Sequence, residues 1–170
     1  MKKTKLIAAL AGLSAAVTVA GSCGEAAVTV TGKEGIEEFV RDYYSNEHLV
    51  LSESVSDKSQ TLVWFVSDEE MLKTCMAITF KNKPNNQYEF VGTETVEKLS
   101  GDIWECFWHD GVSFYVNDQR CAEYTFSDNG NTMKAQLGEM PTSLFCNLSG
   151  ADSDLHVTFN DKNGRRVFGN

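Results

Sequence analysis

Residues 103–116 read IWECFWHDGVSFYV, two apolar runs that flank a short polar segment. Runs rich in Trp, Phe, Tyr and Val on either side of a Gly-containing turn are typical of a β-hairpin. A three-residue loop, His109-Asp110-Gly111, would place Gly111 at the left-handed bulge position. In that register the facing pairs on one side are all apolar: Trp108 with Val112, Cys106 with Phe114, and Trp104 with Val116.

A shorter turn at Asp110-Gly111 would change this pairing. Phe107 would then face Phe114, and the two faces of the hairpin would be mixed. Because a slip of one residue moves every side chain to the other face, we favour the three-residue loop.

Besides this hairpin, one segment of the mature chain has the periodicity of a helix. Ile36, Phe39, Val40 and Tyr43 recur at the spacing of a single helix face. The run Thr31-Gly32-Lys33-Glu34 matches the capping box S/T-x-x-E, and the pattern ends near Ser45-Asn46. We therefore expect a helix over about residues 32–45.

From residue 48 onward, strand-like runs recur at a spacing of about 8–12 residues with turn signals between them. Residues 61–66 are almost continuously apolar, as in a central strand covered on both faces. The sequence predicts an α+β fold, mostly β, in which one N-terminal helix packs on an antiparallel meander sheet of about eight strands that can curl toward a barrel. This order of elements is similar to that of cystatin-like domains, an analogy that implies no function.

The amino terminus has the form of an export signal. Lys2, Lys3 and Lys5 precede an uncharged run, residues 6–20, that is short for a membrane span. The following Ala20-Gly21-Ser22-Cys23 resembles a bacterial lipobox, although Ala20 occupies the position where Leu is usual. We expect a signal peptide over residues 1–22, a lipidated tether over 23–31 and a single globular domain over 32–170.

The resemblance implies that signal peptidase II cuts before Cys23 and that Cys23 carries diacylglycerol. Two or more acyl chains, palmitate among them, hold a protein stably on a membrane. The domain would then be anchored outside the cytoplasm, on the cell membrane or outer membrane. The alternative is an ordinary signal peptide cut after Ser22, which yields a secreted or periplasmic protein.

The charge balance excludes one class of partner. The whole chain has 15 basic and 24 acidic residues, and loss of the signal leaves 12 basic residues, a net charge of −12. Nucleic-acid binding needs clustered Lys and Arg, so we expect no nucleic-acid partner. Acidic clusters such as Asp68-Glu69-Glu70 instead favour a basic protein partner.

Four cysteines remain if Cys23 is lipidated. They have no C-x-x-C spacing, which argues against a zinc site, and the even count in an exported chain favours up to two disulfides with three connectivities. The alternative is four separate buried thiols. These disulfide candidates are Cys75, Cys106, Cys121 and Cys146.

No catalytic motif is present, and we predict neither a catalytic residue nor a cofactor. Asp152, Asp154 and His156 would point the same way on a strand and could hold a divalent cation, or they could form a solvated face. Phe107 and Tyr115 fall on the face opposite Trp104 and could form an exposed aromatic patch.

These features favour an exported, membrane-tethered, non-enzymatic binding protein that engages a basic protein or a surface polymer. An inhibitor or immunity-type protein is the sharpest version of this hypothesis. Two alternatives stay open: a small extracytoplasmic hydrolase with a site near His109 or His156, and a carbohydrate-binding module that uses Phe107 and Tyr115 on a surface glycan.

Overall fold

The computed structural model describes residues 27–67, 74–150 and 154–169. The expected signal peptide, Cys23, the acidic run 68–70 and Asp152 lie outside these residues. In the described residues the chain forms one α-helix and thirteen β-strands, all of whose pairings are antiparallel. The predicted class, mostly β with one helix, is confirmed, but the prediction of one sheet with about eight strands is wrong.

The strands are divided among three sheets, named here A, B and C. Sheet A has the spatial order β1 (Thr29–Thr31), β5 (Gln87–Glu94), β4 (Cys75–Lys83), β3 (Gln60–Ser67), β2 (Leu49–Ser56). Sheet B has the order β11 (Thr142–Asn147), β8 (Gly111–Val116), β7 (Ile103–Trp108), β6 (Val96–Ser100). Sheet C has the order β10 (Asn131–Gln136), β9 (Glu123–Asp128), β12 (Leu155–Asn160), β13 (Arg166–Gly169).

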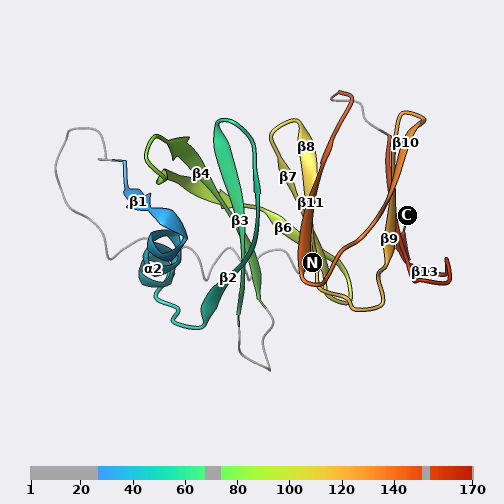
Figure 1. Ribbon diagram of the computed structural model, residues 1–170, viewed down its shortest axis with the longest axis horizontal. Helices are drawn as coiled ribbons and strands as arrows, with labels where there is room; N and C mark the ends of the chain where they lie inside the picture. Colours follow the sequence, from blue (N-terminus) through green and yellow to red (C-terminus); the bar gives the residue numbers. More distant parts are fainter. Residues whose placement is uncertain (1–26, 68–73, 151–153, 170) are drawn as a thin grey trace, which may run out of the picture.

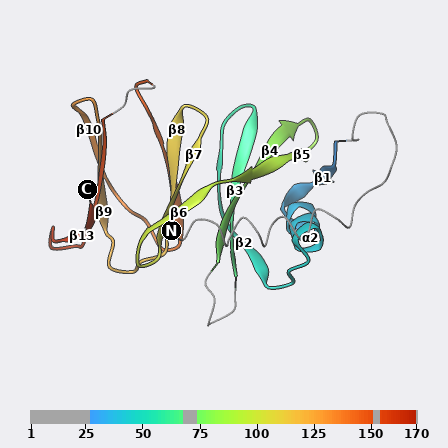
Figure 2. The same ribbon diagram turned by 180° about the vertical axis from the view of Figure 1, so that it is seen from behind.

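Helix α2 (Gly32–Tyr44) and the three sheets follow one another along the long axis of the molecule (Figure 1). The helix and β1 lie at one end, sheet A and then sheet B come next, and sheet C with β13 lies at the other end. The view from behind shows the same succession (Figure 2).

Each boundary between layers holds its own apolar core. The helix packs on sheet A through Ile36, Val40, Leu49, Leu51, Val63, Phe65, Ile78 and Phe80. Sheets A and B meet through Leu62, Trp64, Ala77, Trp104, Cys106, Trp108 and Tyr115. Sheets B and C meet through Ile103, Val112, Phe114, Val116, Cys121, Phe126, Cys146, Val157 and Phe159.

Two strands that are apolar on both faces explain this stack. All six residues of β8 are buried, and residues 61–65 of β3 are buried as well. A strand of this kind needs a layer on each side of its sheet. Since β3 and β8 lie in different sheets, a single meander covered by one helix could not bury all of this surface.

The helix has the predicted extent but not the predicted N-terminal cap. Thr31 is the N-cap residue and makes no side-chain capping hydrogen bond, because it is the last residue of β1 and pairs with Gln87. Residues 29–31, at the end of a segment whose small, mixed composition suits a tether or a first strand, form the strand β1. The helix ends at Ser45, within the predicted Ser45-Asn46 cap, and Ser45 adopts the left-handed conformation with φ of 50°.

Helix α2 covers the face of sheet A that points away from sheet B. It therefore covers neither Trp104 and Trp108 nor Phe107 and Tyr115. No helix among the described residues is long and apolar enough to cross a membrane.

The hairpin between β7 and β8 has a register that differs from both registers we considered. Trp108 pairs with Gly111 and Trp104 pairs with Tyr115, so the turn consists of His109 and Asp110 alone. His109, with φ of 51°, takes the left-handed conformation that we expected of Gly111. Gly111 is instead a strand residue, and it faces Asn147 of β11.

Close approach between β8 and β11 is the physical reason for a glycine at position 111. A Cβ atom there would lie 2.5 Å from the carbonyl oxygen of Cys146 and would also meet the ring of Phe145. The absence of a side chain is thus required by packing rather than by the turn.

We predict that Gly111→Ala lowers the free energy of unfolding by about 2–3 kcal/mol, because the added methyl group must displace β11 or Phe145. Gly92→Ala in β5 is the matched control, since its Cβ would meet nothing within 4 Å. Urea denaturation of both variants measures the difference. Equal stability of the two variants would contradict this account of the β8–β11 contact.

Candidate functional site

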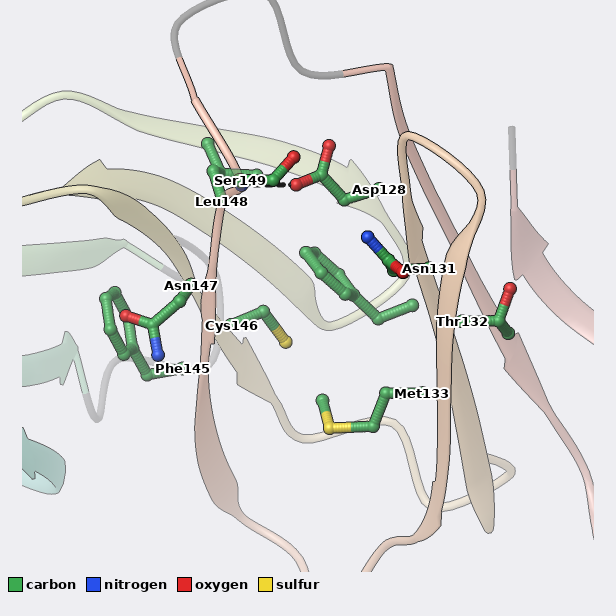
Figure 3. A pocket seen from close by; sticks show the side chains of 10 residues that line it. Asp128, Asn131, Thr132, Met133, Phe145, Cys146, Asn147, Leu148 and Ser149 are labelled. Carbon is green, nitrogen blue, oxygen red and sulfur yellow. Dashed lines mark hydrogen bonds between the residues drawn. The ribbon is translucent and has the colours of Figure 1, made fainter.

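A groove between sheets B and C is the strongest candidate for a binding site. Its volume is about 440 Å³, within the range of about 300–1,000 Å³ that is usual for ligand sites. Figure 3 shows the groove between β10 and β11. It is lined by Phe126, Asp128, Asn131, Thr132, Met133, Phe145, Cys146, Asn147, Leu148 and Ser149.

The groove exists because two consecutive strands separate. Strands β10 and β11 follow one another in the sequence, yet β10 pairs with β9 in sheet C and β11 pairs with β8 in sheet B. Each is the edge strand of its sheet, with one neighbour. Two sheet edges therefore border the same opening, and the outward backbone groups of an edge strand can pair with another chain.

The lining combines an apolar floor with a polar rim. Met133 is 43% exposed, and Figure 3 shows it and Cys146 pointing toward each other across the groove. The unbranched side chain of methionine adapts to apolar partners of different shape. Asn131, Asn147 and Ser149 supply polar groups around this floor.

One end of the groove is held by a polar network. The Oδ2 atom of Asp128, a residue only 3% exposed, accepts a hydrogen bond from the backbone N–H of Ser149. Asn129 donates through Nδ2 to the Ser149 hydroxyl at 2.9 Å, and its Oδ1 accepts from the backbone N–H of Asp154 at 3.1 Å. These bonds tie the β9–β10 turn to the segment after β11, so this end of the groove is pre-formed.

His109 lies in the turn between β7 and β8, outside the groove. Its Nε2 atom is 3.5 Å from Oδ2 of Asp57, and its ring centroid is 4.5 Å from that of Trp108. Hydrogen bonds from the backbone N–H groups of Gln60 and Ser59 hold the pKa of Asp57 below its usual value. The pair thus joins the β2–β3 turn of sheet A to the β7–β8 turn of sheet B.

His156 and Asp154 lie together, as their spacing predicted, with Nε2 of His156 3.4 Å from Oδ1 of Asp154. Asp152, the third expected metal ligand, lies outside the described residues. Within those residues, no three side chains of His, Cys, Asp or Glu gather in a way that could hold a metal ion.

The expected aromatic face of Phe107 and Tyr115 is wrong, because it depended on the wrong hairpin register. Phe107 is across from Val112 and is 61% exposed, whereas Tyr115 is across from Trp104 and is 1% exposed. The two rings lie on opposite faces of sheet B. Tyr115 belongs to the core between sheets A and B, where its hydroxyl lies 3.0 Å from that of Ser52.

The structure shows the four cysteines as free thiols and contains none of the expected disulfides. Cys75 is half-buried and packs against the core between sheets A and B, which contains Cys106. Cys121 and Cys146 belong to the core between sheets B and C. Burial raises the pKa of all four thiols, to about 12 for Cys106 and Cys146 and to about 11 for Cys121.

Comparisons with protein-family models, with curated proteins and with solved structures found no match. The function is therefore argued from the geometry of this chain.

The groove is not predictable from the sequence, although part of its signal is present there. The Asn129-Gly130 turn and the alternation of Met133 and Ala135 predict a strand at the place where β10 lies. Alternation does not indicate which strand is the neighbour. The 43% exposure of Met133 follows from the divergence of β10 and β11, which no local pattern encodes.

We predict that Cys106 and Cys146 resist alkylation by iodoacetamide at pH 8 in the folded protein. With a pKa of about 12, about one thiol in 10⁴ is ionised at this pH, and both side chains are buried. Mass spectrometry after labelling with and without denaturant measures this. Rapid labelling of the folded protein would show that these thiols are not buried. Labelling in denaturant that occurs only after a reductant is added would show that they form disulfides.

Proposed function

We propose that this chain is an exported, membrane-tethered, non-enzymatic binding protein of the cell envelope, and that an extended segment of a basic partner protein binds in the groove between β10 and β11. The observation that carries the proposal is the pair of sheet edges that border one apolar opening. An added strand pairs through its backbone with a sheet edge, while its alternate side chains enter pockets.

The backbone of β10 is suited to this pairing. Asn131 faces Asp128 across a two-residue turn, and such a flanking pair is hydrogen-bonded in antiparallel hairpins. Since the pattern alternates along the strand, Thr132 and Lys134 direct their backbone N–H and C=O groups away from β9. These groups are the free pairing positions of the β10 edge.

The β11 edge can be assigned in the same way. The backbone N–H of Leu148 donates to the carbonyl of Asp110 at 2.8 Å, which continues the pairing of Cys146 with Val112. The alternate residues Phe145 and Asn147 then direct their backbone groups away from β8. An incoming strand would therefore find pairing positions on either side of the groove.

Charge supports a basic occupant. The chain without its signal has a net charge of −12, and Asp128 is the charged side chain among the described residues that line the groove. Long-range attraction of this kind raises association rates and weakens as salt rises. If the occupant belongs to a basic exported enzyme, the protein acts as an inhibitor or immunity-type protein.

The groove offers mainly apolar and backbone contacts. Within the described residues neither His109 nor His156 lines it, and the sequence contains no catalytic motif. Its chemistry is that of a surface for apolar and backbone contacts.

The anchor leads to a prediction of its own. Cys23→Ala removes the thiol that would carry diacylglycerol, so we expect the protein to move from the membrane fraction to the soluble fraction. Ser22→Ala, which keeps a small residue before the cysteine, is the control and should stay with the membrane. Immunoblots of the fractions measure this, and a Cys23→Ala variant that remains in the membrane fraction refutes the lipid anchor.

The groove is tested by panning displayed random peptides against the purified protein. We expect the selected sequences to alternate apolar residues and to contain Lys or Arg, because they must fill the Met133 side of the groove in an acidic field. Thr132→Pro removes an outward N–H, leaves the backbone hydrogen bonds to β9 in place and removes the 3.3 Å side-chain bond to Ser127. It should weaken peptide binding about tenfold or more.

Met133→Gln should weaken the same peptides, since it replaces an apolar contact by a polar isostere. Val91→Thr is the matched control because Val91 is 53% exposed and does not line the groove. Calorimetry of the selected peptides gives the affinities. Acidic consensus sequences, or peptides that bind all three variants as tightly as the unchanged protein, count against the proposal.

A further inference from the structure

A second hollow lies at the edge of sheet C opposite to β10, beside β13 and the hairpin turn between β12 and β13. It has a volume of about 550 Å³. Its walls come from that turn and from the segment between β8 and β9. The lining residues are Gln119, Arg120, Ala122, Asp161, Lys162, Asn163, Arg165, Arg166 and Val167.

The charge of this hollow is opposite to that of the chain. Arg120, Lys162, Arg165 and Arg166 line it, and Asp161 is the acidic side chain among its described lining residues. The chain without its signal has twice as many acidic as basic residues. Four cations at one hollow therefore create a local field that the overall composition does not predict.

Three of these cations form no salt bridge with a described residue, although the charge of Arg165 helps to lower the pKa of Asp161. Lys162, Arg165 and Arg166 are exposed, and none of them forms a salt bridge with a residue that the structure describes. By contrast, Lys134 pairs with Glu123 at 2.8 Å and Lys83 pairs with Glu89. These three cations thus lie within five positions of the sequence.

The two acids close to the hollow, Asp161 and Asp118, stay ionised because their pKa values are lowered, so four cations face two carboxylates there. Oδ1 of Asp161 accepts backbone N–H groups from Asn163 at 2.8 Å and Arg165 at 2.9 Å, and these bonds hold its pKa below the usual value. The Nε and Nη2 atoms of Arg120 donate hydrogen bonds to Oδ1 and Oδ2 of Asp118 at 2.9 and 2.6 Å. This fork fixes the Arg120 guanidinium at the edge of the hollow, and the Asp161 network fixes the turn.

We propose that this hollow binds consecutive phosphate groups of a polyanionic polymer. Guanidinium groups pair with phosphate oxygens in a forked geometry. Two of the three cations without a salt bridge, Arg165 and Arg166, are arginines, whereas the Nε and Nη2 atoms of Arg120 are bound to Asp118. One exposed ion pair contributes little, so stable binding needs several phosphates to be engaged at once. A polymer meets this need, whereas a single phosphate does not.

The position of the hollow favours a polymer in solution or in the envelope over the lipid headgroups of the anchoring membrane. Strand β1, which continues the proposed tether, lies at the opposite end of the long axis from β13 (Figure 1). Five residues separate Cys23 from Thr29, and a fully extended segment of this length spans about 18 Å. This argument alone rests on the proposed anchor; the phosphate site itself does not.

The test is calorimetric titration of the purified protein with inorganic polyphosphate at about 0.15 M salt, where a Debye length of about 8 Å screens the more distant acidic residues. The variant Lys162→Gln/Arg165→Gln/Arg166→Gln should bind about tenfold or more weakly. Its plot of log K against log salt should lose about one unit of slope for each cation removed.

The matched control is Lys33→Gln/Lys58→Gln/Lys81→Gln, which removes the same charge from exposed positions outside the hollow. It should bind polyphosphate as the unchanged protein does. Equal losses in the two variants, or no heat with polyphosphate, overturn the proposal. A parallel arm uses vesicles of equal phosphatidylglycerol and phosphatidylcholine, and binding to these vesicles but not to polyphosphate overturns the assignment to a polymer.

Discussion

The indole N–H of Trp64 in sheet A donates a hydrogen bond of 3.2 Å to the hydroxyl of Ser113 in β8, and that hydroxyl donates at 3.2 Å to the carbonyl of Leu144 in β11. Trp64 and Ser113 are both fully buried, so each polar atom needs this partner. The chain of bonds crosses from sheet A through the central strand of sheet B to its edge. It therefore fixes how the two sheets face each other.

The opposite face of β8 determines the rest of the molecule. Val112, Phe114 and Val116 point away from sheet A, and sheet C covers them with Phe126 and Phe159. Strand β11 pairs with β8 in sheet B and β10 pairs with β9 in sheet C, so these consecutive strands belong to different sheets. The groove is thus a consequence of burying β8 on both faces, and its geometry is as stable as the two cores beside it.

Local patterns in the sequence predicted local structure well. The spacing of Ile36 and Val40 placed the helix, and its end at Ser45 agrees with the predicted cap. The hairpin at residues 103–116 was also predicted, but its register was not. The error came from assigning Gly111 to the turn, because the reason for that glycine is the carbonyl of Cys146, which lies on a strand about 35 residues away.

The candidate sites divide in the same way. Asp154 and His156 are neighbours on one short segment, so their spacing sufficed to bring them together. The pairing of Phe107 with Tyr115 depended on register and failed with it. The groove depends on which sheet each strand joins, and this is decided by packing between distant segments rather than by alternation within either strand.

The distribution of charge around sheet C connects the two proposed sites. A chain with a net charge of −9 repels polyanions at long range, yet at physiological salt the field of distant acids is screened within about 8 Å. The local cations at the β12–β13 turn then determine what binds there, while the groove at the β10 edge of sheet C keeps its acidic surroundings. Because the two hollows share no lining residue, a basic segment and a phosphate polymer can bind one molecule together without competing for a side chain. Sheet C is thus the structural link between the two proposed sites. A ligand at one of them changes the electrostatic field at the other by no more than its own screened charge.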